Sequence, residues 1–196
     1  LHLENLRLTA PHLKGEGRWD FASNGAMNGS CAVEIDNLHL LQPLFPEWDP
    51  YGSLTAKATY NGSEATLDLI AKHLYLKSVY FEQAAFYSDL QKPFSQMQGI
   101  ISLDLEKGRF RDLEIDSALL ETKSEGDHWP FTLFAEGVWN RDFEGHSEGV
   151  WRLAEGEFHA DIDKLYGLFY SHPFSLENPT HMSYSPTKIE IGQTNI

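Results

Sequence analysis

The sequence contains a single cysteine, Cys31, among its 196 residues. One cysteine cannot form an internal disulfide, so the chain has no disulfide framework. The position of Cys31 in an alternating stretch is typical of a small, buried apolar side chain. This low cysteine content is compatible with the cytosol, and also with a periplasmic protein that has lost most of its cysteines.

Long apolar runs are also missing. No run approaches the 18 residues of a transmembrane helix, and no signal peptide is recognisable. The chain opens at Leu1 inside a strand-like pattern, and residues 194–196 form no closing element. We therefore expect a piece of a longer protein, so the absence of targeting signals here says nothing about the parent.

Positive charge is scarce. The chain has 15 Lys and Arg against 29 Asp and Glu, which gives a net charge of −14 and a pI of about 4.9. Nucleic-acid binding needs clustered cations, so the composition argues against it. Adhesion to anionic lipid headgroups is disfavoured for the same reason. The acidic residues are dispersed, which indicates a solvated face.

Catalytic constellations are absent from the sequence. None of the nine histidines belongs to an HxH or HExxH motif, and no serine has a GxSxG context. Acidic residues alternate at Asp104, Glu106, Glu114 and Asp116, which is typical of a solvent-facing row rather than of a glycosidase carboxylate pair. We expect no enzymatic activity, no metal site and no cofactor.

The clearest pattern that is present is a hairpin over residues 51–71. Two alternating runs flank Asn61-Gly62, a strong hairpin signal because both residues tolerate positive φ. Period two with one apolar face predicts half-buried strands. The apolar positions of this hairpin are Leu54, Ala56, Ala58, Tyr60, Ala65, Leu67, Leu69 and Ala71.

Most of the chain repeats this alternation and predicts an all-β protein. The first strand slips its alternation near Glu4-Asn5, which predicts a β-bulge. Lys107-Gly108 and Gly126-Asp127 are expected turns. Apolar residues recur at helical spacing over residues 36–45 and 161–170, so two short helices are predicted there.

A weak internal repeat is also visible. Gly17-Arg18-Trp19 is similar to Gly149-Val150-Trp151, and residues 33–38 are similar to residues 160–165. Repeats of this kind predict stacked units that bury a continuous apolar surface. We expect one fragment, 1–196, with related units at about 15–120 and 130–196.

Three consecutive motifs resemble the TamB family and, more loosely, AsmA-like proteins. Residues 35–46, IDNLHLLQPLFP, form a helical punctuation after a strand. Residues 52–62 follow a G-x-L-x-A-x-A-x-x-x-G pattern, and residues 67–71, LDLIA, follow with an apolar-x-apolar-x-Ala rhythm. The resemblance covers residues 15–120. Family members usually carry Thr and Pro just after the turn glycine, whereas this chain has Ser63-Glu64-Ala65.

The resemblance implies an elongated protein with a long, curved antiparallel or mixed sheet that forms an open, β-taco-like trough with one or two short helices. It implies a segment of a lipid-transfer bridge that carries phospholipid acyl chains and supports outer-membrane homeostasis or protein translocation and assembly. Such proteins span the periplasm of diderm bacteria, are anchored in the inner membrane, and work with an outer-membrane barrel partner of the TamA type. An apolar groove suits acyl chains, since each buried CH₂ contributes about 0.8 kcal/mol.

The apolar positions of the predicted strands are the expected lining of this lipid groove. They are Trp19, Phe21, Val33, Leu54, Ala56, Ala58, Leu67, Leu69, Leu74, Leu76, Phe81, Ile101, Leu103, Leu105, Phe131, Leu133, Trp151 and Leu153.

Two other hypotheses fit the same alternation. A structural or adhesive all-β module, such as a sandwich or β-solenoid, would close the apolar faces into a dry core without lipid. Irregular strand lengths and turns disfavour the solenoid. A carbohydrate-active jelly roll would require an exposed aromatic platform beside acidic residues.

Overall fold

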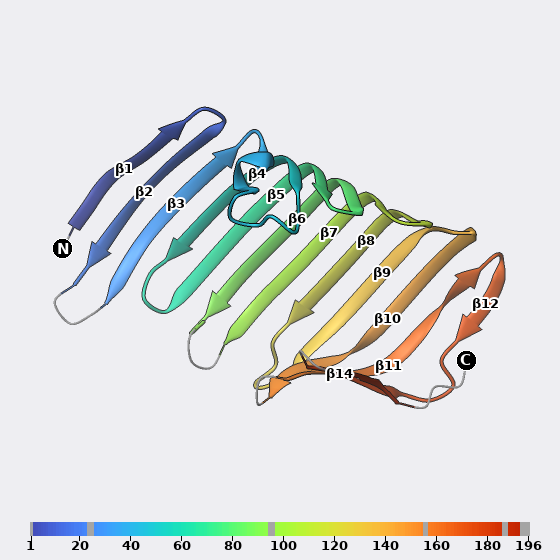
Figure 1. The fold of residues 1–196 in the computed structure, drawn as a ribbon. Coiled ribbons are helices and arrows are strands. Elements are labelled where there is room, and N and C mark those ends of the chain that lie inside the picture. The colour runs from blue at the N-terminus through green and yellow to red at the C-terminus, as the bar shows by residue number, and fades with distance from the viewer. Residues whose placement is uncertain (1, 23–25, 94–96, 155–156, 186–187, 193–196) are drawn as a thin grey trace.

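Fourteen strands form one antiparallel sheet in the computed structural model, which describes residues 2–22, 26–93, 97–154, 157–185 and 188–192. Strands β1 to β11 follow one another across the sheet in chain order, and both β12 and β13 pair with β11 (Figure 1). The strands are β1 His2–Ala10, β2 Leu13–Phe21, β3 Met27–Ile35, β4 Pro50–Tyr60, β5 Glu64–Leu76, β6 Val79–Gln91, β7 Gln98–Phe110, β8 Leu113–Lys123, β9 Trp129–Trp139, β10 Arg141–Ala154, β11 Glu157–Phe169, β12 His172–Ser175, β13 Thr180–Ser185 and β14 Lys188–Ile191. The all-β prediction and the open, curved sheet are confirmed, and every described pairing is antiparallel.

The predicted hairpin over residues 51–71 is formed by β4 and β5. Its turn is closed by Asn61, whose Oδ1 accepts hydrogen bonds from the backbone N–H groups of Ser63 (3.2 Å) and Glu64 (2.8 Å). Gly62 follows with φ +87°, a conformation that glycine adopts without steric cost. The turn fixes the register, which pairs Tyr60 with Ala65.

The first of the two predicted helices is a short 3₁₀ helix, η1, over Leu38–Leu41. Asn37 caps it, because its side chain accepts a hydrogen bond from the backbone N–H of His39 at 3.1 Å. Leu38 is buried, and the His39 ring stacks on Tyr51 of β4 at 4.7 Å. This helix therefore packs beside β4 at one end of the sheet (Figure 1).

The second predicted helix, over residues 161–170, is wrong, because this segment belongs to β11. The ladder between β10 and β11 shifts register at this point: Gly149 pairs with Ile162, and Glu148 pairs with Lys164. The extra residue, Asp163, makes the apolar positions recur as Ile162 and Leu165. A β-bulge thus imitates the spacing of a helix. The two similar segments of the weak repeat accordingly differ in backbone, since residues 33–38 leave a strand and enter η1.

The expected turn at Lys107-Gly108 is also wrong. Strand β7 runs through both residues, and the chain turns after Phe110. Lys107 has φ +47° and has no Cα partner in the ladders to β6 and β8. It is a bulged residue inside a strand, and its left-handed backbone explains why the local sequence resembles a turn.

Lys107 is one of four such residues at the same level of the sheet. In the ladders of β5 to β8, His73, Glu82 and Asp116 also have no Cα partner, and His73 has φ +48°. Bulges bend strands and increase their twist. This row therefore accounts for part of the sheet's curvature (Figure 1). The predicted bulge near Glu4-Asn5 is confirmed by a register shift between Leu3 and Leu6.

Gly52 offers a test of the backbone at the β4–β5 hairpin. Its φ is +109°, and an added Cβ would lie 2.5 Å from the carbonyl oxygen of His73. Gly126 has φ +66°, but an added Cβ would meet no atom within 4 Å. We expect Gly126→Ala to lower the free energy of unfolding by about 1 kcal/mol, and Gly52→Ala by about 3 kcal/mol. Urea unfolding measures both, and equal losses would contradict the close approach of Gly52 to the backbone of His73.

Candidate functional site

The register of the sheet places apolar residues in continuous rows across neighbouring strands. Leu54 pairs with Ala71, Ala71 with Ala84, Ala84 with Leu105, and Leu105 with Ala118. Directly paired residues project from the same face of a sheet. These residues therefore define one side of the molecule, which we call the apolar face.

All 18 residues expected to line a groove lie on this apolar face by register. Leu74, Leu76 and Phe81 lie beyond the row of bulges, where simple alternation would place them on the opposite face. The bulges return these side chains to the apolar face. Leu74 pairs with Phe81, and the row continues through Gly108 and Ile115 to Gly137 of β9. Strand β9 runs without a bulge, so it links the rows on both sides.

The opposite side, which we call the polar face, presents a charged row. Lys57 lies directly opposite Asp68 in the ladder between β4 and β5, although no ion pair joins these two described side chains. Near the other end, Lys164 Nζ lies 2.7 Å from Glu148 Oε2, and this hydrogen bond raises the pKa of Lys164 above its usual value. Both partners are well exposed, so such pairs favour solubility more than stability.

Little covers the apolar face. The accessible surface of the chain is 13317 Å², whereas a compact protein of 22.3 kDa exposes about 9,400 Å². Among the described residues, no side chain is completely buried. On the apolar face Leu8 is 59% exposed, Leu133 38% and Leu153 68%. In the part of the chain that the structure describes, the apolar side of the sheet thus lacks a second layer.

An aromatic cluster lies at one end of this face. Trp129 and Trp151 stack at 5.1 Å, and Trp151 stacks on Phe158 at 5.8 Å. Trp151 Nε1 donates a hydrogen bond to Thr122 Oγ1 (3.1 Å), and that hydroxyl donates to the carbonyl oxygen of Pro130 (2.7 Å). The partly buried indole N–H is thereby satisfied, and the rings remain available for apolar contact.

Several residues of the apolar face were missed by the sequence analysis. Phe86, Leu120 and Phe143 belong to it through their pairing with Leu69, Leu103 and Gly137. Phe86 was detectable, since it alternates with its neighbours in β6. Leu165 was missed because the bulge in β11 disguised its strand.

The arrangement provides apolar contact and little acid–base chemistry. Within the described part of the chain, no group of three His, Cys, Asp or Glu side chains is suited to a metal ion. In the same part of the chain, no helix is long and apolar enough to cross a bilayer.

Comparisons with known proteins add no relatives. No protein-family model matches the chain, and no curated protein or solved structure is significantly similar to it.

A substitution at Thr122 tests the aromatic cluster. Thr122→Val removes the acceptor of the Trp151 N–H inside a buried site, since Thr122 is only 5% exposed. We expect the free energy of unfolding to fall by about 1–3 kcal/mol. Thr59→Val is the matched control, because Thr59 bonds Thr66 in an exposed position, and it should change stability by less than about 0.5 kcal/mol. Equal effects in urea unfolding would contradict the role of Thr122.

Proposed function

We propose that the apolar face binds the acyl chains of phospholipids, and that this chain is a segment of a lipid-transfer bridge. The observation that supports the proposal is the continuous apolar face, which no other part of the described chain covers. Uncovered apolar patches of this extent mark binding surfaces in soluble proteins.

Acyl chains fit this surface better than a ligand with many polar groups. The rows from Leu54 to Ala118 and from Ala56 to Leu120 contain only aliphatic or aromatic side chains. Each methylene transferred from water to such a surface contributes about 0.8 kcal/mol. Contacts of this type are non-directional, so a chain can move along the face without breaking hydrogen bonds.

The polar face makes the sheet amphipathic. Its charged rows keep one side of the sheet hydrated, and the headgroups of bound lipids would remain in water beside the rims. In the proposed parent protein, successive sheets of this kind would form a trough across the periplasm, with an outer-membrane barrel of the TamA type as partner. The sequence motifs of residues 35–71 support this wider assignment.

Co-purifying lipid is the direct test. We expect organic extracts of the purified chain to contain phospholipid by mass spectrometry. Leu54→Asp, Leu67→Asp and Leu103→Asp each place a carboxylate on the apolar face, and each should reduce bound lipid at least about fivefold, because burying a charge against acyl chains is unfavourable.

The polar face supplies matched controls. Ile70→Asp and Leu119→Asp make similar changes at positions that are 36% and 38% exposed, and they should leave the lipid content unchanged. Absence of lipid in the wild-type protein, or equal losses in both sets of variants, would reject the proposal. A dimer that buries the apolar faces without lipid would instead support the structural module.

A further inference from the structure

Four cations lie on the polar face of β1 to β4, in a segment that is itself acidic. Residues 1–60 contain four Lys and Arg, namely Arg7, Lys14, Arg18 and Lys57. All four line two adjoining hollows on this part of the sheet. The average composition of the chain conceals this local cluster.

The hollows arise from small side chains on β3. Ala32 lies between Glu16 of β2 and Lys57 of β4 in the register, and Ser30 lies between Arg18 and Thr59. Strands two positions apart in a sheet are separated by about 9–10 Å. Longer side chains on β2 and β4 therefore flank a gap one strand wide. The two hollows have volumes of about 530 and 400 Å³.

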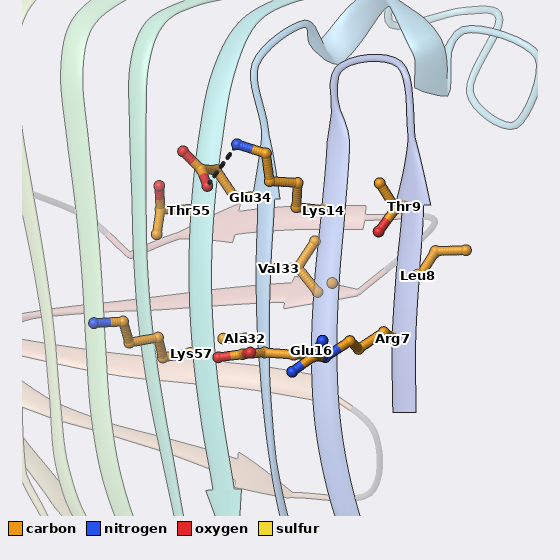
Figure 2. A pocket seen from close by; sticks show the side chains of 11 residues that line it. Arg7, Leu8, Thr9, Lys14, Glu16, Ala32, Val33, Glu34, Thr55 and Lys57 are labelled. Carbon is orange, nitrogen blue, oxygen red and sulfur yellow. Dashed lines mark ion pairs between the residues drawn. The ribbon is translucent and has the colours of Figure 1, made fainter. Parts of the chain in front are cut away.

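Within the described residues, the cations of the smaller hollow lack an ion-pair partner, whereas Lys14 of the larger hollow has one. Figure 2 shows one ion pair among the residues drawn, between Lys14 Nζ and Glu34 Oε2 at 3.9 Å. Among the residues that the structure describes, Arg7, Arg18 and Lys57 form no ion pair. These three cations line the smaller hollow.

One carboxylate, that of Glu16, lines the same hollow. The lining therefore carries a local excess of positive charge. Salt screens exposed charges over about 8 Å at physiological ionic strength, so the net charge of −14 does not cancel this excess at contact distance.

We propose that this hollow is a binding site for a phosphate-bearing anion. Guanidinium groups donate paired hydrogen bonds to phosphate oxygens, and the Lys ammonium adds a point charge. Arg7 and Arg18 belong to β1 and β2, and Lys57 belongs to β4, on the other side of Ala32 in the register. The site lies on the side opposite the apolar face, so it does not depend on acyl-chain binding there.

Pyrophosphate is a suitable probe, measured by isothermal titration calorimetry with the full 196-residue chain. Arg18→Gln and Lys57→Gln should each weaken binding about fivefold or more, since each removes a charge-assisted contact. Lys123→Gln makes the same charge change on the polar face of β8, outside the hollow, and should leave the affinity nearly unchanged. Glu16→Gln should tighten binding about threefold, a gain that a misfolded variant cannot produce.

Vesicles distinguish a lipid headgroup from a soluble phosphate compound as the source of the anion. Co-sedimentation with phosphatidylcholine vesicles that contain phosphatidylglycerol, lost in Arg18→Gln and competed by pyrophosphate, would support a headgroup ligand. Saturable pyrophosphate binding without vesicle binding would support a soluble ligand. Failure of wild-type protein to bind either probe, or equal weakening by Lys123→Gln, would overturn the proposal.

Discussion

Backbone hydrogen bonding between neighbouring antiparallel strands determines the register of this sheet, and the register determines which side chains meet. Each strand from β2 to β10 is paired on both sides, and the strands reach 14 residues in length. The usual second contribution, a closed apolar core, is small here, because only seven apolar side chains of the described residues are buried, and four of them are alanines. Register, rather than packing against a second layer, decides which residues meet.

The same constraint explains why the apolar face can serve as a surface. Small residues such as Ala71, Ala84 and Ala118 are buried on it, since their longer neighbours shelter them. The longer side chains keep part of their surface exposed and available to a ligand. A single layer therefore separates two chemically distinct sides, one lined by apolar side chains and one whose first four strands carry cations on both sides of Ala32.

Much of this architecture was predictable from period-two alternation. The hairpin of β4 and β5, the bulge in β1 and the 3₁₀ helix after β3 all follow from local signals that act over a few residues. The helix predicted over 161–170 failed for a physical reason: an extra residue in a strand shifts the apolar spacing from two to three, which is also a helical interval. The turn predicted at Lys107-Gly108 failed for the same reason, because Lys107 is an extra residue within a strand. The cation cluster was beyond prediction, because Arg7 and Lys57 are 50 residues apart and only the register of three ladders brings them to one hollow.

The row of bulged residues His73, Glu82, Lys107 and Asp116 has an evolutionary consequence. Each inserts one residue at the same level of four adjacent strands, so the side chains beyond the row keep their correct faces. If one of these residues alone were deleted, the side chains beyond it in that strand would change faces. Charged side chains would then enter an apolar row. Changes of length in these strands must therefore occur together in neighbours, or be confined to the hairpin turns. Within this part of the sheet, insertions and deletions are expected to be inherited as sets.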